Sequence, residues 1–446
     1  MKSILVLGAG RSSSSLISYL LREAEKYNWS ITVGDFSEAM AKERIGKARV
    51  GRAISFDITD TAKSEVAVEA ADVVISLIPA HLHSLVAKLC LQKKKHLLTA
   101  SYVSDEMQSF HEEAKEKNLL FMNECGLDPG IDHMSAMQVM DKIKSKGGKI
   151  TSFESFTGGL IAPETDPGNP WRYKFTWNSR NVVMAGQSTA KYLQHGSYRF
   201  VPYQQLFQRI VPVSVPGYGE YEGYANRDSL KYIETYGLQG IQTMLRGTLR
   251  NKGFCSAWNV FVQLGCCDDT YEMENVSEMT HRDFIDAFLP AHFSKTIQQK
   301  ISEQLGVSVS GHEMECLQWS GLFENEKMGL TKGTPAQILE HILNKKWKLN
   351  ANDKDLIVMW HRFIYEQGGK KTEIQASLIA KGDDSIFTAM AKTVGLPLAI
   401  TAKLLMQNKI QQRGVAIPVS KEIYVPVLEE LKSMGIELVE REVEKY

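Results

Sequence analysis

The sequence predicts an α/β protein with a Rossmann-type doubly wound parallel sheet, a mixed α/β substrate domain and a helical insertion. Three observations predict this fold class. Short apolar runs alternate with helical segments over residues 3–122, a glycine-rich turn directly follows the first run, and the pattern changes after Pro129. Apolar strands that alternate with helices are typical of a parallel sheet with crossover helices.

The first part of the chain shows this alternation most clearly. Apolar runs of strand length predict six strands, at residues 3–7, 30–33, 53–56, 71–77, 96–99 and 119–122. Polar or amphipathic segments of helical character lie between them, among them residues 38–47 and 105–117. Six such strands form a doubly wound sheet, which holds its ligand at the carboxyl ends of the strands.

The rest of the chain predicts a second domain and its insertion. Residues 149–157 alternate like a half-buried strand, and residues 158–170 are rich in glycine, proline and acidic side chains, which indicates a loop. The apolar helix expected near the C-terminus is interrupted by Gly395-Leu396-Pro397. Further strands and helices are predicted at residues 284–288, 297–305, 336–343, 356–363, 372–379, 387–405 and 425–434.

We therefore expect three parts. A dinucleotide-binding domain comprises residues 1–127 and 388–446, and a substrate-binding and dimerisation domain comprises residues 128–270 and 350–387. Residues 271–349 form the helical insertion. We expect the cleft between the first two parts to hold the dinucleotide and the substrate, and the protein to be a homodimer.

The composition favours a folded protein that acts on a small molecule. Of the 446 residues, 43% are hydrophobic and 23% are charged, which is ordinary globular usage and excludes a disordered chain. The 52 basic and 52 acidic side chains cancel, so no net field attracts nucleic acid or an anionic membrane. We expect a small-molecule substrate, no nucleic-acid partner and no membrane partner.

The cysteines and the N-terminus favour a cytoplasmic protein without a metal site. The six cysteines show no C-x-x-C spacing, so neither a zinc site nor a disulfide framework is expected. The N-terminal apolar run is too short for a signal-peptide core and is broken at once by glycine. Reduced thiols and a cytoplasmic location are the corresponding expectations.

The turn after the first predicted strand has the pattern G-x-G-x-x-S, which departs from G-x-G-x-x-G only at its third position. Serine is small enough for the close helix packing that this position needs, and the first glycine permits the tight turn. The N–H groups at the start of the next helix are suited to a pyrophosphate. Because strand, turn and helix follow one another, the motif predicts a dinucleotide site at Gly8, Gly10, Arg11, Ser12 and Ser13.

Asp35, at the end of the second predicted strand, indicates which dinucleotide is bound. An acid there accepts hydrogen bonds from ribose hydroxyls and repels a 2′-phosphate, so NAD is favoured over NADP. Lys42 or Arg44 could soften this preference. The alternative is that Asp35 only caps the following helix. Asp57, after the third strand, is a second candidate for the adenine side, and capping explains it almost equally well.

The fourth predicted strand ends in Leu77, Ile78 and Pro79, where an open α/β sheet places its ligand crevice. These three residues are therefore candidates for contact with the cofactor. His81 and His83 follow directly. Position alone seldom identifies an acid or base, so we interpret both histidines as bystanders near the cofactor.

Several longer strings follow predicted strands or lie in the second domain. They are A-S-Y at 100–102, G-L-D-P-G-I-D-H at 126–133, T-G-G-L at 157–160, Y-K-F at 173–175, N-R-D-S at 226–229, L-R-G-T-L-R at 245–250 and A-M-A-K-T-V-G-L-P at 389–397. With these strings the chain closely resembles the glutamate-forming saccharopine dehydrogenase (saccharopine reductase) family. The resemblance runs nearly end to end, from the glycine turn to residue 424.

The resemblance implies an NAD(P)-dependent oxidative cleavage of saccharopine, a secondary amine that joins the lysine skeleton to glutarate. The products would be L-glutamate and 2-aminoadipate 6-semialdehyde, in a reversible reaction of lysine metabolism. This chemistry needs a deprotonated amine, hydride transfer to the nicotinamide, addition of water and collapse of a carbinolamine. At least one proton shuttle is therefore required.

The resemblance implies Asp128 as the shuttle, with Tyr102 beside it, and Leu127 and Pro129 at the cofactor. A carboxylate buried near the nicotinamide would have a raised pKa, which suits acid–base work near neutral pH. The alternative is that Asp128 belongs only to a strand-exit turn, since Asp, Pro and Gly are common turn residues.

A substrate with three carboxylates calls for arginine, which binds carboxylate bidentately. Arg227 and Arg246 are the first candidates, although Asp228 could be the structural partner of Arg227. The family commonly has a cysteine where this chain has Thr157, and threonine can donate a hydrogen bond but cannot titrate near neutral pH. The further substrate-binding candidates are Ser101, Thr157, Gly158, Lys174 and Arg250.

Two rival functions are open. Another imine-forming dehydrogenase, such as a carboxynorspermidine dehydrogenase, acts on a substrate with fewer carboxylates, so the number of arginines in the pocket would discriminate. A non-catalytic NAD-binding protein would keep the phosphate turn and lack the set of Asp128, Tyr102 and Arg227.

Overall fold

The structure is a computed structural model that describes residues 1–185, 187, 189–292 and 294–443. The chain divides into two compact units. Unit 1 comprises Met1–Lys149 and Leu378–Val439, and unit 2 comprises Ile150–Ser377 and Glu440–Tyr446. The three-part division expected from the sequence stays a prediction.

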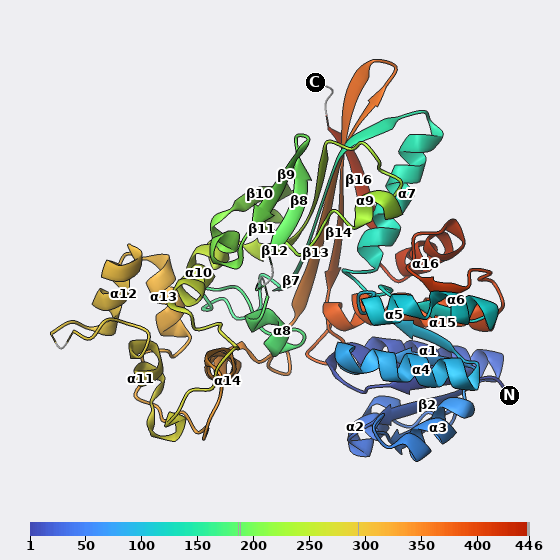
Figure 1. Ribbon diagram of the computed structural model, residues 1–446, viewed down its shortest axis with the longest axis horizontal. Coiled ribbons are helices and arrows are strands. Elements are labelled where there is room, and N and C mark those ends of the chain that lie inside the picture. Colours follow the sequence, from blue (N-terminus) through green and yellow to red (C-terminus); the bar gives the residue numbers. More distant parts are fainter. Residues whose placement is uncertain (186, 188, 293, 444–446) are drawn as a thin grey trace. The chain divides into compact units, whose positions relative to one another are not determined.

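A parallel sheet is the centre of unit 1 (Figure 1). Among the described residues it has seven strands in the order β15-β6-β5-β4-β1-β2-β3, and every neighbouring pair is parallel. The strands are β1 (Ser3–Leu7), β2 (Ser30–Asp35), β3 (Gly51–Ser55), β4 (Val73–Ser76), β5 (His96–Thr99), β6 (Leu120–Met122) and β15 (Gly414–Ala416). The predicted Rossmann-type doubly wound sheet is therefore confirmed.

The helices of unit 1 follow the strands as crossover connections. They are α1 (Ser14–Tyr27), α2 (Glu38–Ile45), α3 (Thr61–Glu69), α4 (His83–Lys93), α5 (Asp105–Ser109), α6 (His111–Glu116), α7 (Ile131–Ser145), α15 (Ala389–Met406) and α16 (Lys421–Ser433), with the 3-10 turns η1 (Arg11–Ser13) and η2 (Ala80–Leu82). The single helix predicted at 105–117 is two helices, because the chain turns at Phe110.

Two features of unit 1 differ from the sequence prediction. The sheet has a seventh strand, β15, whose three residues come from the C-terminal part of the chain and pair with β6. The apolar helix α15 is continuous through Pro397. It begins at Thr388, whose side chain accepts a hydrogen bond from the Ala391 N–H and so satisfies one free donor of the first turn.

Helix α15 is a core helix. It is long and apolar enough to cross a membrane, but 89% of its apolar window is buried inside the protein, and it packs against α1. The two helices approach closely because Gly395 has no side chain: a Cβ atom there would lie 3.0 Å from the Cβ of Leu16. Gly395, which was predicted to interrupt the helix, therefore allows the close packing of α15 on α1.

A second, mixed sheet is the centre of unit 2. The described strands have the order β10-β11-β12-β7-β13-β14-β16, and β8 and β9 extend from β12. Strand β12 pairs parallel with β7 and antiparallel with β11. The strands are β7 (Lys149–Ile161), β8 (Ala190–Gln194), β9 (Ser197–Val201), β10 (Ile210–Val215), β11 (Gly219–Ala225), β12 (Thr243–Asn251), β13 (Asp355–Gln367), β14 (Lys370–Lys381) and β16 (Leu438–Val443). The loop predicted from residue 158 begins later, because β7 continues to Ile161.

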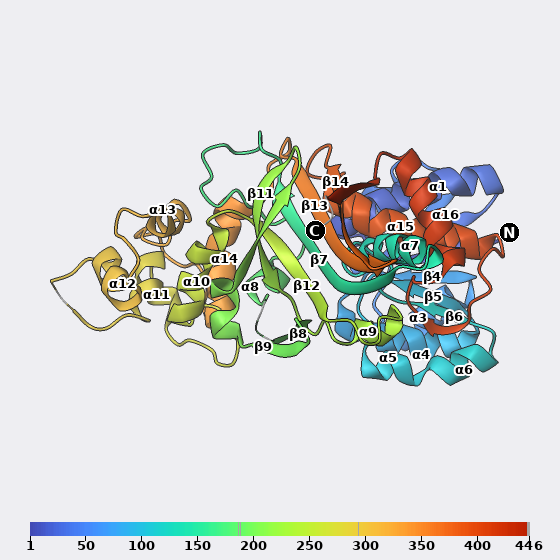
Figure 2. The ribbon, with the colours of Figure 1, turned by 90° about the horizontal axis from the view of Figure 1, so that it is seen from above.

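Helices fill the segment between β12 and β13, as predicted for the insertion, and the described residues there form no strand. Figure 2 shows these helices grouped at one end of unit 2. The helices of unit 2 are α8 (Ser179–Val183), α9 (Tyr232–Thr235), α10 (Phe254–Leu264), α11 (His281–Asp286), α12 (Ile297–Leu305), α13 (His312–Trp319) and α14 (Pro335–Trp347), with the 3-10 turns η3 (Tyr203–Gln208) and η4 (Val276–Glu278). Three of them begin with a capping box, at Thr280, Thr296 and Thr334, which satisfies free backbone donors at each start.

An aromatic cluster anchors this helical segment. Trp171 stacks on Phe261 and meets Trp347 edge to face, with ring centroids 5.8 and 5.1 Å apart. Its indole N–H donates to the carbonyl oxygen of Cys316 at 2.8 Å. Large buried aromatic rings contribute much apolar area with few rotatable bonds, so the cluster holds α10, α13 and α14 in place.

Candidate active site

The glycine turn of unit 1 has the geometry of a phosphate cradle. Gly8 lies in the left-handed region, with φ of 103°, and a Cβ atom there would lie 3.0 Å from the carbonyl oxygen of Leu77. A Cβ atom at Gly10 would meet nothing within 4 Å, so this side of the turn is open. Ser13 is buried and its hydroxyl donates to the Gly10 carbonyl at 2.8 Å. The small third residue thus closes the turn onto α1, and Arg11 and Ser12 start η1.

Asp35 is tied to this turn. One carboxylate oxygen accepts from the Ala9 N–H at 2.8 Å and the other from the Ser37 N–H at 2.9 Å. The cap of α2 is Ser37, whose side chain accepts from the Met40 N–H, so the proposed capping role of Asp35 belongs to its neighbour. Arg44 also reaches the turn: its Nε donates to the Ala9 carbonyl at 3.3 Å. An acidic and a basic side chain therefore both bind the backbone of Ala9.

Asp57 organises the turn after β3. Its Oδ1 accepts from the N–H and the hydroxyl of Thr59, at 2.8 and 2.7 Å. The cap of α3 is Asp60, which accepts from the Lys63 N–H. The capping alternative for Asp57 is therefore wrong, and its place on the adenine side stays a prediction.

Tyr102 and Asp128 come together in unit 1. The Tyr102 hydroxyl donates to Asp128 Oδ1 at 3.4 Å. From residue 119 to residue 137, all of them described, every residue except Asp128 is buried. The residue that the family resemblance singles out is therefore also the one residue of this run that is not buried.

The loop that presents Asp128 is held from within. The Gly126 N–H donates to the Pro129 carbonyl at 2.9 Å, and the Gly130 N–H donates to the Asp132 carboxylate at 2.6 Å. A Cβ atom at Gly130 would lie 2.0 Å from the Gly126 carbonyl, so only glycine fits. This network gives Asp128 a defined position on a rigid loop.

A buried ionic group lies under this loop. His133 Nε2 is 2.9 Å from Glu124 Oε2, and His133 Nδ1 is 3.7 Å from Asp132 Oδ2, with all three residues at most 5% exposed. Glu124 was not predicted as a functional residue from the sequence. A charged residue between apolar Met122 and Cys125 at a strand exit was the available signal, because buried acids are rare without partners.

Ser101, the substrate-binding candidate beside Tyr102, contacts a histidine. Its hydroxyl lies 2.8 Å from His83 Nε2. His83, predicted to be a bystander near the cofactor, is buried at the carboxyl ends of β4 and β5. His81 is exposed.

In unit 2, strand β12 presents Arg246, Thr248 and Arg250 at every second residue, so the three side chains share one face. Arg246 and Arg250 are 6% and 5% exposed. The Arg246 guanidinium lies 4.3 Å from the ring centroid of Tyr232, and its backbone N–H donates to Ser229 Oγ at 2.9 Å. Ser229 belongs to the N-R-D-S string, so this string and β12 are joined.

Arg250 is buried, and it has no acidic partner in the part of the chain that the structure describes. Its guanidinium lies 5.0 Å from the ring of Tyr173 and 5.2 Å from that of Phe254, and its Nη1 donates to the Leu249 carbonyl. Within the described part of the chain, its Nε has no hydrogen-bond partner and no carboxylate forms an ion pair with it. A buried charge in this state is costly, and an anionic ligand would relieve the cost.

Thr157 and Gly158 lie on β7 beside this arginine. Thr157 pairs in register with Thr248 of β12, and a Cβ atom at Gly158 would lie 2.7 Å from the Leu249 carbonyl. The Thr157 hydroxyl is buried and, among the described residues, has no hydrogen-bond partner. Both residues are thus brought next to Leu249 and Arg250.

Arg227, the first anchor candidate, is exposed, and its backbone has a positive φ of 53°. Asp228 accepts from the Leu230 N–H at 3.0 Å and lies 3.7 Å from Lys191 Nζ. The Asp228 carboxylate therefore serves its own loop and Lys191. Because Arg250 and Arg246 are buried and Arg227 is exposed, the first two are better candidates for binding a ligand carboxylate.

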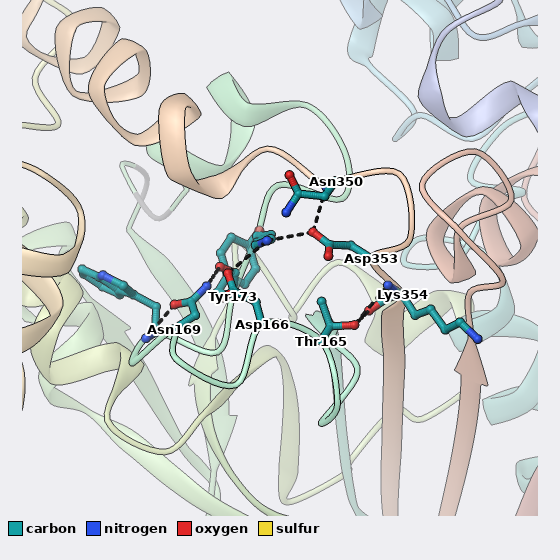
Figure 3. A network of polar contacts seen from close by, with 9 residues as sticks. Thr165, Asp166, Asn169, Tyr173, Asn350, Asp353 and Lys354 are labelled. Atoms are coloured by element: carbon teal, nitrogen blue, oxygen red, sulfur yellow. Dashed lines mark hydrogen bonds and ion pairs between the residues drawn. The ribbon is translucent and has the colours of Figure 1, made fainter.

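Lys174 belongs to a structural network rather than to an open cation site. Its Nζ lies 2.7 Å from Asp353 and 3.0 Å from Asp166. Figure 3 shows these two carboxylates within the network. Burial lowers the pKa of Lys174, but the bonds to the two carboxylates outweigh it and raise that pKa. In Figure 3 the Thr165 hydroxyl donates to the Lys354 carbonyl, and the Asn350 N–H donates to the Asp353 carboxylate. The network therefore fastens the 162–174 loop to the start of β13. The lysine's charge is already neutralised there.

The fold and these residues define a Rossmann-type dinucleotide-binding oxidoreductase. The "Saccharopine dehydrogenase NADP binding domain" matches residues 4–122, and the "Saccharopine dehydrogenase C-terminal domain" matches residues 126–436. The chain belongs to the saccharopine dehydrogenase family.

Full-length relatives have the same family name. The saccharopine dehydrogenases (NADP(+), L-glutamate-forming) of Schizosaccharomyces pombe and Saccharomyces cerevisiae are 32% identical to the chain, over 100% and 99% of both lengths. The mitochondrial alpha-aminoadipic semialdehyde synthase of Bos taurus is 36% identical over 98% of this chain. The chain spans about half the length, 47%, of that relative.

A solved structure agrees with the fold. The apo L-Glu-forming saccharopine dehydrogenase of Saccharomyces cerevisiae superposes with a TM-score of 0.89 at 31% identity, and the match covers 100% of each chain. The homospermidine synthase of Legionella pneumophila, with a TM-score of 0.54 at 11% identity, shares the fold alone. The family comparisons support a nicotinamide dinucleotide as cofactor and favour NADP over the NAD that Asp35 predicted.

Proposed function

We propose that the protein catalyses the reversible, NADP-dependent oxidative cleavage of saccharopine to L-glutamate and 2-aminoadipate 6-semialdehyde. The observation that carries the proposal is the Tyr102 hydroxyl on the half-buried Asp128 carboxylate. This pair lies in a chain that matches L-glutamate-forming saccharopine dehydrogenases over their whole length.

The dinucleotide is held by the glycine turn. The open side of Gly10 and the N-terminal N–H groups of η1 and α1 suit a pyrophosphate, and Leu77 packs against Gly8 beside it. Ile78, Pro79, Leu127 and Pro129 are the proposed contacts on the nicotinamide side. When bound, the nicotinamide accepts a hydride from the carbon beside the substrate nitrogen.

NADP is compatible with the turn because Asp35 is engaged. Both Asp35 oxygens accept backbone N–H bonds, and the Arg44 side chain, 15% exposed, donates to Ala9. We propose that Arg44 supplies the positive charge that a 2′-phosphate needs, since arginine matches phosphate geometry. Arg11, exposed at the start of η1, is a second cation near the phosphates.

Asp128 is the proposed proton carrier at the substrate nitrogen. The Tyr102 hydroxyl donates to Asp128 Oδ1, and the carboxylate can accept a proton from the amine. Asp128 later returns the proton as the carbinolamine collapses. The family's cysteine is replaced by Thr157, so no thiol at that position shares this task.

The carboxylates of saccharopine are bound by arginine. Arg250 is the strongest proposed anchor, because its buried guanidinium lacks an acidic partner among the described residues. The Thr157 hydroxyl, also without a described partner, can donate to the same carboxylate. Arg246, Arg227, Ser101 and the Gly158 backbone complete the proposed substrate set, from which we leave out Lys174.

The test is direct. The purified protein with saccharopine and NADP+ should show rising absorbance at 340 nm and release one glutamate per NADPH. NAD+ in place of NADP+ measures the cofactor preference, and N-(carboxyalkyl)diamines test the rival imine-forming reaction. Absence of turnover of saccharopine with either oxidised nicotinamide contradicts the proposal.

Three broader proposals accompany this function: a homodimer, a cytoplasmic location, and the division into dinucleotide domain, substrate domain and helical insertion. All six cysteines are buried and unbridged, which is compatible with a reducing compartment. The bovine relative is named as a mitochondrial protein. Fractionation of cells is therefore the measurement that decides where this protein is located. Sedimentation equilibrium measures the oligomeric state.

A further inference from the structure

Three hydroxyl groups meet on the ring of His83. His83 Nδ1 lies 2.8 Å from Ser76 Oγ, and Nε2 lies 2.8 Å from Ser101 Oγ and 3.2 Å from Thr99 Oγ1. Ser76 ends β4, Thr99 ends β5, and His83 begins α4. Because β4 and β5 are parallel neighbours in register at Ser76 and Thr99, their carboxyl ends bring the hydroxyls together.

The ring is buried and uncharged. His83 is 5% exposed, and burial, with a smaller effect from His81, lowers its pKa to about 4. A neutral imidazole has one N–H donor and one acceptor nitrogen. One ring nitrogen therefore donates and the other accepts, so the roles that the ring takes toward Ser76 and toward Ser101 are coupled.

The segment around Tyr102 is fastened on both sides. Before it, the Ser101 N–H donates to Thr99 Oγ1 at 3.2 Å and the Ser101 carbonyl accepts from the Glu124 N–H at 3.0 Å. After it, the Val103 N–H donates to the Glu124 carboxylate at 3.1 Å. The bond between the Ser101 hydroxyl and His83 is thus the side-chain anchor that precedes Tyr102.

We propose that His83 is a positioning residue: through Ser101 it holds residues 101–103 so that the Tyr102 hydroxyl meets the Asp128 carboxylate. The proposal rests on the proposed function of the Tyr102–Asp128 pair. His83 touches neither the substrate nor the reacting atoms. Its effect is on the geometry of the pair and on the direction in which the Ser101 hydroxyl points.

Two substitutions separate this role from simple packing. Glutamine at position 83 reaches as far as the ring's Nε2 and can still bind Ser101, whereas asparagine reaches only as far as Nδ1 and can bind Ser76 alone. Since one hydrogen bond contributes about 1 kcal/mol, His83→Asn should lower kcat about five- to tenfold. His83→Gln should keep kcat within about twofold, and the KM for NADP+ should stay the same in both.

A double-mutant cycle tests the path through Ser101. If His83 acts through Ser101, Ser101→Ala should lower kcat like His83→Asn, and the double variant should be no worse than either single variant. The matched control is His96→Gln, which changes a half-buried histidine of unit 1 that is bound to the Leu120 N–H at the other end of β5. That control should leave kcat unchanged while its unfolding midpoint falls.

Additive losses in the cycle, or equal kcat for His83→Asn and His83→Gln, overturn the positioning role and leave the proposed function intact. A readout that needs no turnover is the ¹⁵N chemical shift of the His83 ring. Ser101→Ala should move the Nε2 signal and leave the other ring nitrogen bound to Ser76. An unmoved Nε2 signal overturns the inference even if the protein does not oxidise saccharopine.

Discussion

The hydroxyl of Tyr102 donates to the carboxylate of Asp128 at 3.4 Å. Asp128 is the only residue from 119 to 137, all of them described, that is not buried. We expect Asp128→Asn to lower kcat about 10²- to 10⁴-fold, because an amide cannot carry the proton. Tyr102→Phe should lower kcat less, since it removes only the donor. Stopped-flow absorbance at 340 nm measures both.

The matched control is Tyr424→Phe. Its hydroxyl donates to the Asp141 carboxylate at 2.6 Å in the same unit, so it forms a second Tyr–Asp pair outside the candidate site. We expect this variant to have the wild-type kcat. A comparable loss in Tyr424→Phe and Tyr102→Phe would show that the effect is one of stability.

Arg250→Met should raise the KM for saccharopine by at least tenfold without lowering the stability of the free protein. The guanidinium is buried and no carboxylate is paired with it in the described part of the chain, so its removal costs the unliganded fold no ion pair. Arg362→Met is the control, because Arg362 bridges Glu154 and Glu373 at 3.4 and 2.8 Å. The control should lower the urea midpoint and leave KM unchanged; the opposite pattern rejects the anchor role.

Arg44→Met should raise the KM for NADP+ and leave that for NAD+ nearly unchanged. The reason is that a 2′-phosphate loses its cation, whereas a ribose hydroxyl does not need one. Asp35→Ser removes the bonds to Ala9 and Ser37, so we expect weaker binding of both dinucleotides together with a shift toward NADP. Arg22→Met, a substitution at an exposed arginine of α1, is the control. Equal effects of Arg44→Met on both cofactors would contradict the phosphate role.

Lys174→Met should destabilise unit 2 by about 3 to 5 kcal/mol, because it leaves Asp166 and Asp353 facing each other without their cation. The KM for saccharopine should not change. Chemical unfolding followed by tryptophan fluorescence is a suitable measurement, since Trp171 lies in the same loop. The double variant Lys174→Met/Asp353→Asn should recover part of the loss; a raised KM with normal stability would restore Lys174 to the substrate set.

His83 should make the protein less stable in mild acid. Its pKa is about 4 in the folded chain and ordinarily 6.5, so the unfolded chain takes up the proton first as the pH falls. The contribution of His83 to the free energy of unfolding is therefore fully present above pH 6.5. It is lost as the pH falls toward 4, by up to about 3 kcal/mol. Between pH 7 and pH 5 the wild type should lose more unfolding free energy than His83→Gln. Equal losses would contradict this.

Local patterns predicted the features that depend on neighbouring residues. Gly8 and Gly10 were recognisable because strand, turn and helix follow within a few residues, and the family strings brought Tyr102 and Asp128 forward. The partners of His83 were not predictable, since Ser76 and Ser101 reach the ring only after β4 and β5 align. Likewise, the sequence around Lys174 predicts a free cation, because its partner Asp353 lies far along the chain and comes close only in the folded protein.

The preference for NAD illustrates a different limit of sequence patterns. An acid after the second strand predicts ribose binding by position, but the carboxylate of Asp35 is bound to Ala9 and Ser37. Which of two roles an acid takes depends on the backbone donors around it. The same applies to Arg250, whose missing counter-ion is a property of the folded core.

Strand β15 and helix α15 have a consequence for synthesis on the ribosome. Strands β1 to β6 are made before residues 150–377, but the edge strand β15 and the helix α15, which packs against α1, are made only after them. The nascent segment that holds β1 to β6 therefore exposes the open edge of β6 and the apolar face of α1 while residues 150–377 are made. We expect this segment to depend on chaperones until α15 and β15 have been made.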